Sequence, residues 1–259
     1  MRYLIANWKM QLSEPESESL ARGVVQRWAG EGASADGVSV VLCPSHLALE
    51  RVASITKGTP VALGAQDAFW MDKGAYTGEI SPVTLRELGA EYCLVGHSER
   101  REFLGETDEM VNRKTLALLK HGIVPVICVG ETRAEREAGK RNAVVIDQVR
   151  AALDGVSLVG AQTVVVAYEP RWVIGTGKAV TPDDAAEMHH LIISALHDLL
   201  GADVAERQTA VIYGGSADSS NLAAFLAMPG ISGTLVGGAS LKQDEFAAMA
   251  RITADAARA

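Results

Sequence analysis

The sequence has few of the residues that build disulfide frameworks or metal sites. It contains three cysteines in 259 residues, and Cys43, Cys93 and Cys128 each lie within an apolar run. An odd number of cysteines in such surroundings argues against a disulfide framework, so we expect a reducing compartment, the cytoplasm. No grouping of cysteine, histidine and carboxylate residues has the spacing of metal ligands, and the sequence therefore predicts no metal ion.

Excess positive charge and long apolar runs are also absent. The formal net charge is −8 at pH 7, and no basic stripe is present to hold a series of phosphates, which argues against a nucleic-acid partner. No apolar run approaches the length of a membrane span, so we expect no membrane partner. An anionic ligand of this acidic chain must therefore be held by a local site rather than by overall charge.

What the sequence does contain is a regular alternation of two kinds of segment. Short runs rich in β-branched residues alternate with longer segments of helical period. The short runs are residues 2–6, 38–43, 60–64, 92–95, 123–129, 163–168, 209–213 and 233–236. These runs are continuously apolar, which is typical of strands in a parallel sheet that helices cover.

The segment of residues 181–200 is the clearest predicted helix, since Thr181 can cap its N-terminus and Pro182 suits its first turn. Eight strand–helix units without a linker predict one closed (β/α)8 barrel, an α/β fold with a single domain over residues 1–259. An open doubly wound sheet is the alternative fold. It would require a glycine-rich turn after the first strand, where residues 6–9 read Ala-Asn-Trp-Lys instead.

Polar residues and glycines follow the predicted strands at the points where the strands end. The carboxyl ends of the strands carry the active site in barrels of this kind, so these residues should converge on one face. They are Asn7 and Lys9 after the first strand, Gln66 and Asp67 after the third, His97, Ser98 and Glu99 after the fourth, Glu169 after the sixth, Gly214, Gly215 and Ser216 after the seventh, and Gly237 and Gly238 after the eighth.

Two of these candidates have plain structural explanations as well. Lys9 could be a solvated charge just past a strand. His97 could be a histidine at a helix entrance, and we expect Ser98 to be the N-cap of that helix. A helix start so close disfavours the charged imidazolium and leaves a neutral ring that can still donate one hydrogen bond.

Glu169 is the candidate general base. An ion pair with Arg171 or Lys178 is the alternative for this carboxylate. The neighbouring tyrosine, proline and tryptophan at residues 168, 170 and 172 place apolar bulk around it. An apolar setting favours a general base over a surface ion pair.

The glycines after the last two strands predict an anion site. Backbone N–H groups of Gly-Gly turns can approach a phosphate closely, and Ser216 adds a hydroxyl. A carboxylate base, a neutral histidine, a lysine and a phosphate cradle suit proton transfer beside a carbonyl in a small phosphorylated molecule. We expect no cofactor, because hydride transfer would need a nicotinamide fingerprint that the sequence lacks.

The connection of residues 66–79 is long and carries Phe69, Trp70 and Tyr76. Long connections in compact domains are usually functional or bind partners. A surface flap packed on its own aromatic side chains explains the composition equally well.

Several short motifs occur in a specific order along the whole chain. They are ANWKM at residues 6–10, GAQ at 64–66, GAYTGE at 74–79, GHSERR at 96–101, AYEP at 167–170, IGTGK at 174–178, YGGS at 213–216 and LVGGAS at 235–240. Through these motifs the chain resembles the triosephosphate isomerase family over its whole length. The resemblance implies the TIM barrel fold.

The resemblance implies a cofactor-independent isomerase that interconverts dihydroxyacetone phosphate and D-glyceraldehyde 3-phosphate through an enediolate, a step of glycolysis and gluconeogenesis. It implies that Glu169 removes a carbon-bound proton and returns it to the neighbouring carbon. His97 would polarise the carbonyl and move protons between the enediolate oxygens. Lys9 and Asn7 would hold the developing negative charge, and Glu99 would position Lys9.

The resemblance also implies how the phosphate is held and covered. The phosphate would rest on the backbone of Gly175, Ser216, Gly237 and Gly238, under a lid formed by residues 170–180. In that lid Arg171 occupies a hinge position that usually carries a small aliphatic residue in the family.

A homodimer is the assembly that the resemblance implies. The loop of residues 66–79, which includes Thr77, would insert beside Asn7 and Lys9 of the partner subunit. Asp67 in this loop stands where the family usually has asparagine.

Two other functions stay open at the level of the sequence. One is an isomerase for a four-carbon ketose phosphate, although the short lid motif at residues 174–178 favours the three-carbon substrate. The other is a barrel that binds phosphorylated metabolites without turnover, which the intact Asn7, Lys9, His97 and Glu169 disfavour.

Overall fold

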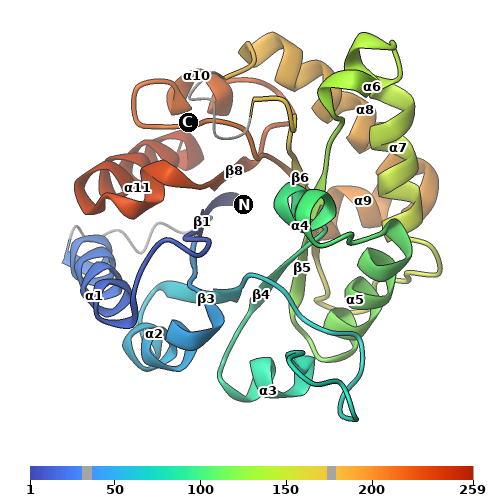
Figure 1. Ribbon diagram of the computed structural model, residues 1–259. Coiled ribbons are helices and arrows are strands. Elements are labelled where there is room, and N and C mark those ends of the chain that lie inside the picture. Colours follow the sequence, from blue (N-terminus) through green and yellow to red (C-terminus); the bar gives the residue numbers. More distant parts are fainter. Residues whose placement is uncertain (31–36, 174–178, 259) are drawn as a thin grey trace.

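The closed barrel expected from the alternating segments is present in the computed structural model, which describes residues 1–30, 37–173 and 179–258. Eight parallel strands of these residues pair in chain order and close on themselves (Figure 1). They are β1 (Arg2–Asn7), β2 (Val38–Cys43), β3 (Val61–Ala65), β4 (Tyr92–Val95), β5 (Val124–Val129), β6 (Val164–Tyr168), β7 (Thr209–Tyr213) and β8 (Gly233–Val236). The pairing of β1 with β8, in which Ile5 lies opposite Leu235, closes the ring and excludes the open-sheet alternative.

Helices surround the strands and cover the outside of the barrel (Figure 1). They are α1 (Glu14–Gly30), η1 (His46–Ala48), α2 (Leu49–Thr56), α3 (Pro82–Glu87), α4 (Ser98–Phe103), α5 (Asp108–Lys120), α6 (Arg133–Glu137), α7 (Arg141–Ala152), α8 (Pro182–Leu200), α9 (Ala202–Gln208), α10 (Leu222–Leu226), η2 (Gly238–Leu241) and α11 (Gln243–Arg258). None of the helices within the described ranges is both long enough and apolar enough to span a bilayer.

The strands bury side chains on both faces, as their continuous apolar sequences predict. The inner cluster fills the barrel with alternate residues of the strands, including Ile5, Val41, Leu94, Val165 and Leu235. The other residues of the same strands point outward and pack against the helices in a larger cluster. Removing both faces from water is the main stabilisation of this fold, at about 25 cal/mol per Å² of apolar surface. It also holds the strand ends in fixed positions.

Local signals in the sequence agree with the elements that form. The predicted helix 181–200 is α8, and the hydroxyl of Thr181 accepts a hydrogen bond from the N–H of Asp184 at 3.1 Å. Every predicted strand begins and ends within one residue of the observed one.

The loop of residues 66–79 contains neither helix nor strand and projects at the edge of the molecule beside α3 (Figure 1). Phe69 stacks on Trp70 with ring centroids 3.9 Å apart, and its ring lies 4.6 Å from that of Tyr76. The aromatic packing expected of a self-supporting flap is therefore present. Tyr76 nevertheless keeps 42% of its surface exposed, so the packing does not use up the apolar surface of the loop.

Candidate active site

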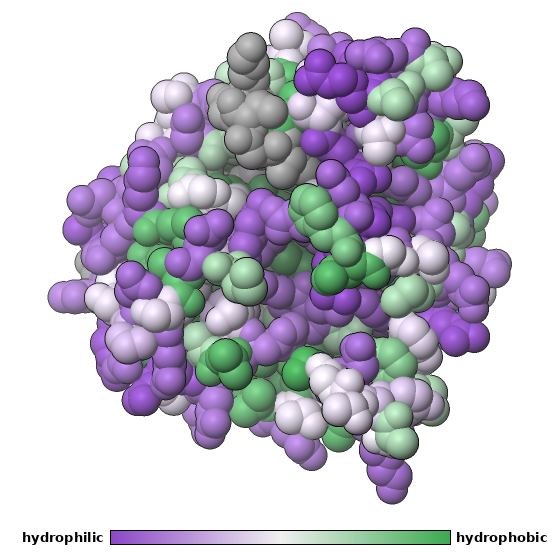
Figure 2. All heavy atoms as spheres, in the orientation of Figure 1, coloured by the Kyte–Doolittle hydropathy of each residue, from purple (hydrophilic) through white to green (hydrophobic). Residues whose placement is uncertain are grey.

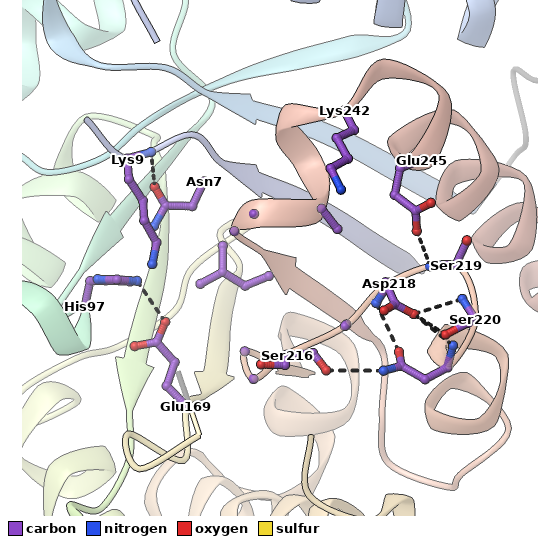
Figure 3. Close-up of a pocket in the computed structure, with 18 residues that line it drawn as sticks. Asn7, Lys9, His97, Glu169, Ser216, Asp218, Ser219, Ser220, Lys242 and Glu245 are labelled. Carbon is purple, nitrogen blue, oxygen red and sulfur yellow. Dashed lines mark hydrogen bonds and ion pairs between the residues drawn. The ribbon is translucent and has the colours of Figure 1, made fainter. Parts of the chain in front are cut away.

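A cavity of about 560 Å³ opens at the carboxyl ends of the strands. Asn7, Lys9, His97 and Glu169 lie together at one side of it, and Ser216 lies apart from them (Figure 3). Gly214, Gly215, Gly237 and Gly238 also line the cavity. In Figure 2 hydrophilic residues cover much of this face of the molecule, with apolar residues between them near its middle. The structure therefore brings together these residues from five strand ends, as their positions in the sequence predict. Gly175 lies outside the described residues.

Glu169 directly follows β6 and its carboxylate is buried; only 2% of the residue is exposed. Its Oε1 lies 3.2 Å from His97 Nε2, and its Oε2 accepts a hydrogen bond from the N–H of Ser98 at 3.0 Å. The first residues of α4 thus contact both carboxylate oxygens. These contacts account for the position of Glu169 without Arg171.

Arg171 instead lies against α4. Its guanidinium NH2 is 3.6 Å from Glu102 Oε2, and its backbone N–H donates to the carbonyl of Glu131 at 3.1 Å. The Arg171 alternative for Glu169 is therefore wrong in this structure, because the arginine side chain points to a different carboxylate. Lys178 lies outside the described residues.

The expectation that Ser98 caps α4 is also wrong, because the N-cap is His97. His97 has φ −53° and ψ 142°, and its Nδ1 accepts a hydrogen bond from the N–H of Glu99 at 3.3 Å. The chain turns one residue earlier than expected, since Gly96 adopts a φ of +71° directly after β4. A ring nitrogen that accepts carries no proton, so the imidazole is neutral with its hydrogen on Nε2, facing Glu169.

Lys9 is held in an uncommon backbone conformation with a φ of +53°. Its N–H donates to Asn7 Oδ1 at 3.0 Å, and its carbonyl accepts from Gln66 Nε2 at 2.9 Å. Its Nζ lies 2.5 Å from Glu99 Oε1. Side chains from β1, from the loop after β3 and from α4 therefore fix both ends of Lys9. Its ammonium group lies in the cavity beside His97 (Figure 3). A left-handed backbone at a non-glycine residue often accompanies a functional position.

The glycine side of the cavity presents backbone rather than side chains. A Cβ on Gly214 would lie 2.7 Å from Glu169 Cγ, so this glycine leaves room for the buried carboxylate. A Cβ on Gly238 would meet no protein atom within 4 Å, so the space beside Gly238 is open to a ligand. Ser216 lies at the same edge, with its hydroxyl 3.3 Å from the carbonyl of Val173.

Glu131 is a buried carboxylate of the site that the reading of strand ends missed. It is fully buried and accepts hydrogen bonds from the hydroxyl of Tyr168, at 3.3 and 3.2 Å, and from the indole N–H of Trp172 at 2.9 Å. It therefore braces the residues on either side of Glu169. Its position two residues after β5 could have identified it, because the other site residues were found by the same rule, that they follow the carboxyl ends of strands.

Outside the predicted set, Asp218, Asn221, Lys242 and Glu245 also line the outer part of the cavity (Figure 3). The Ser219 N–H donates to Glu245 at 2.6 Å. Asp218 and Asn221 lie in the loop after β7, Lys242 directly precedes α11, and Glu245 lies in the first turn of α11. Nothing in the sequence marked them as site residues, because polar and charged residues of these types are common on protein surfaces.

The described part of the chain holds no group of three histidine, cysteine, aspartate or glutamate residues placed to bind a metal ion. Burial raises the pKa of the Cys43, Cys93 and Cys128 thiols. Cysteines of this kind stay protonated and act as small apolar residues. Glu169, His97 and Lys9 are thus the titratable groups that lie against one another in the cavity, and the cysteines are not among its acid–base groups.

Comparison with protein families gives a match over residues 2–253 to the family described as Triosephosphate isomerase. The chain belongs to the triosephosphate isomerase family. It is 46% identical over 243 residues to a triosephosphate isomerase of Roseiflexus sp. (strain RS-1), with 94% of each chain covered.

Two further relatives extend the agreement. The chain is 47% identical to a triosephosphate isomerase of Caldanaerobacter subterraneus subsp. tengcongensis, over 94% of this chain and 96% of the relative. It is 44% identical to one of Herpetosiphon aurantiacus, over 96% and 97% respectively. Triosephosphate isomerase relatives therefore match this chain almost from end to end.

Proposed function

We propose that the chain interconverts dihydroxyacetone phosphate and D-glyceraldehyde 3-phosphate, with Glu169 as the base that transfers the proton between the two carbons. Membership of the triosephosphate isomerase family makes the chain an aldose–ketose isomerase of glycolysis. The observation that carries the residue assignment is the contact of Glu169 with His97 on one side of a cavity whose other side is glycine backbone. A carboxylate and a neutral ring donor at this distance can act on adjacent atoms of one small substrate.

His97 completes the proton transfers. Its Nε2 lies against Glu169, and both residues line the cavity. When substrate binds, its carbonyl oxygen would take the place of Glu169 as the acceptor of the Nε2–H hydrogen bond. A neutral imidazole can give this proton to one enediolate oxygen and take one back from the other. The 3.3 Å contact between Glu99 N–H and Nδ1 keeps the tautomer that this role requires.

Lys9 and Asn7 stabilise the negative charge that develops on the enediolate. The Lys9 ammonium faces the cavity beside the histidine, and Glu99 holds it there. Positioned acid and base groups account for roughly 10²–10⁴ of a typical enzyme's rate enhancement. Prearranged charge and dipoles supply much of the rest because they need no reorganisation as the charge forms.

The substrate phosphate rests on the turns after β7 and β8. Gly237, Gly238 and the backbone of Ser216 offer N–H groups and open space, and η2 begins at Gly238. A cradle of backbone dipoles suits an acidic protein, which has no basic patch for a phosphate. Gly175 would add a further N–H from the lid.

Residues 170–180 are the lid of this proposal, although residues 174–178 lie outside the described part of the chain. At its N-terminal end Trp172 donates to Glu131 and Arg171 contacts Glu102. A closed lid excludes water, which strengthens the electrostatic stabilisation and protects the enediolate.

The test is a coupled assay of the purified protein with glyceraldehyde 3-phosphate and, separately, with a four-carbon ketose phosphate. We expect rapid turnover of the three-carbon substrate and a rate for the four-carbon substrate lower by at least tenfold. Faster turnover of the four-carbon substrate would favour the alternative isomerase. Tight binding of glyceraldehyde 3-phosphate without turnover would favour a binding protein.

We further propose a homodimer formed through the loop of residues 66–79, including Thr77. Met10, Leu47 and Phe103 follow β1, β2 and β4 and are 94%, 94% and 73% exposed. Large exposed apolar side chains that follow strands at the same end of the barrel are typical of a surface that another chain covers. Sedimentation equilibrium of the parent and of Tyr76→Asp tests this: a dimer that dissociates in the variant is expected, and a monomeric parent would contradict it.

The buried free cysteines support the cytoplasm as the compartment of the protein.

A further inference from the structure

Among the described residues that line the cavity, Lys242 is the charged one whose side chain has no partner. Its ammonium group makes no hydrogen bond or ion pair with any residue that the structure describes. A carboxylate three residues further along a helix is a common ion-pair partner of a lysine. Glu245 has this position, yet its Oε1 accepts the N–H of Ser219 at 2.6 Å. The ammonium group of Lys242 therefore stays free.

The backbone of Lys242 is fixed next to the phosphate cradle. Its N–H donates to the carbonyl of Ala239 at 3.3 Å, and its carbonyl accepts the N–H of Phe246 at 2.9 Å. Lys242 directly follows the turn η2, which begins at Gly238. The same short turn thus presents open space for a phosphate at one end and the lysine at the other. The Lys242 side chain extends from the start of α11 toward the cavity (Figure 3).

Asp218, a carboxylate of the outer cavity, is satisfied by its own loop. Its Oδ1 accepts the N–H of Ser220 at 2.9 Å, the hydroxyl of Ser220 at 2.6 Å and the N–H of Asn221 at 3.3 Å. The hydroxyl of Ser220, together with these N–H groups, holds the pKa of the Asp218 carboxyl below its usual range. Asp218 therefore keeps its negative charge without an ion pair to Lys242.

The charges that line the cavity are unfavourable for a phosphate as a set. The described lining has two ammonium groups and three carboxylates, which are Lys9, Lys242, Glu169, Asp218 and Glu245. Lys9 is paired with Glu99 at 2.5 Å, and the whole chain carries a net charge of −8 at pH 7. A phosphate dianion must enter against this field. Lys242 is the positive charge of the described lining that no carboxylate cancels.

We propose that Lys242 is a specificity-determining residue of the isomerase, which favours substrates with a doubly charged phosphate by attracting them into the cavity. This inference rests on the proposed function, since it concerns the same substrate and the same cavity. A cleft with low-dielectric walls concentrates the field of a charge and raises the association rate of a ligand of opposite sign. The phosphate does not react, so the attraction is equal for substrate and transition state and changes KM rather than kcat.

The test compares steady-state kinetics of the parent and of Lys242→Gln with D-glyceraldehyde 3-phosphate and with D-glyceraldehyde, which lacks the phosphate. At an ionic strength of about 0.01 M charges act over about 30 Å. There we expect the variant to lose about fivefold in kcat/KM for the phosphorylated substrate, with kcat within about twofold. At about 1 M the range falls to about 3 Å, and the two proteins should agree within about twofold. With D-glyceraldehyde they should agree at both ionic strengths.

Lys57→Gln is the matched control, because it removes the same charge from an exposed lysine at the other end of the barrel. Lys57 follows α2 and precedes β3, next to the amino end of that strand. This variant should match the parent at both ionic strengths, and Lys242→Arg, which keeps the charge, should retain most of kcat/KM. An equal loss in Lys57→Gln would assign the effect to net charge. A loss that is the same at high salt, or the same with D-glyceraldehyde, would assign it to the local structure. Each of these results would contradict the proposal.

Binding of inorganic phosphate separates this inference from the proposed function, because it requires no turnover. Titration calorimetry at an ionic strength of about 0.01 M should show that Lys242→Gln binds phosphate about fivefold more weakly than the parent. A parent without isomerase activity would refute the proposed function. Equal phosphate affinity and equal kcat/KM in an active parent and in Lys242→Gln would refute this inference alone.

Discussion

The two sides of the active-site cavity are built in different ways. The side with Lys9, His97 and Glu169 consists of side chains that contact one another and are held from behind by further side chains. Gly237 and Gly238 present backbone instead, and a Cβ on Gly238 would meet no protein atom within 4 Å. Polar side chains such as Asp218 and Lys242 also line this part of the cavity. Proton transfer requires titratable groups at defined distances, whereas a phosphate that does not react needs only dipoles and space.

This difference has consequences for the effect of mutations. Changes on the side-chain half should lower kcat and leave phosphate binding intact. Changes on the glycine half should raise KM and leave the chemical step intact. If a substitution in one half changed both kcat and KM, the two halves would not work independently.

The largest effect is expected for Glu169→Gln, which keeps the size of the side chain and removes the base. Its kcat should fall by about 10³-fold or more, since the glutamine amide cannot accept a proton from carbon. Glu169→Asp keeps a carboxylate but withdraws it by one methylene, and its kcat should lie between those of the parent and of Glu169→Gln. Steady-state kinetics measures both, and inorganic phosphate inhibition serves as the control. Near-parental rates in both variants would show that Glu169 is not the base.

His97→Gln should lower kcat by about 10²-fold, because the amide can donate to the carbonyl oxygen but cannot move a proton between two oxygens. The same phosphate inhibition constant is expected in this variant and in the parent. A loss of phosphate affinity as large as the loss of kcat would mean that His97 helps to shape the whole cavity.

Gly238→Ala tests the opposite half. The added methyl group lies in open space, so the stability of the fold should not change, but it occupies the cradle. We expect KM to rise by about tenfold with kcat within about twofold of the parent, since the lost interaction serves the ground state and the transition state equally. An unchanged KM would move the phosphate away from Gly238.

His189 lies outside both halves and should affect stability without affecting kcat. It is fully buried in α8, its Nδ1 lies 2.7 Å from the carbonyl of Ala185, and burial lowers its pKa from 6.5 to about 4. Between these values the unfolded chain binds the proton and the folded chain does not, so the free energy of unfolding falls as the pH drops from 6.5 to about 4. The loss from this group is about 3 kcal/mol.

Urea unfolding of His189→Gln at several pH values checks this. The variant should lose less stability than the parent over that range, while His197→Gln, a change of a partly exposed histidine near the end of α8, should follow the parent. Equal slopes for His189→Gln and the parent would show that the ring is not held neutral.

Much of the fold could be predicted because apolar runs of strand length are a local property. The strands at residues 38–43 and 209–213 were predicted with the same first and last residues that the structure shows. A parallel strand that is buried on both faces is a continuous run of apolar residues, so the strand ends where the run ends. The convergence of Lys9, His97 and Glu169 followed from one topological rule, that strand ends of a closed barrel meet.

Other features could not be predicted because they depend on backbone angles and on distances between remote residues. The N-cap of α4 is His97 rather than the predicted Ser98, because Gly96 takes a positive φ. The pattern of apolar residues in the sequence contains no information about this backbone angle. Asp67, Arg100, Glu106 and Lys114 pair with one another although they lie up to 47 residues apart in the chain. In the sequence each of these side chains reads as a surface charge.

The central claim is that Glu169 transfers a proton through an enediolate, and isotope incorporation from D₂O tests it most directly. Glyceraldehyde 3-phosphate converted by the parent in D₂O should yield dihydroxyacetone phosphate with deuterium bound to carbon, because a carboxylate that holds the transferred proton can exchange it with solvent. Glu169→Gln should show neither conversion nor incorporation above the uncatalysed rate. Full conversion by the parent without any carbon-bound deuterium, together with retained incorporation-free turnover in Glu169→Gln, would indicate a direct hydride shift and contradict the account.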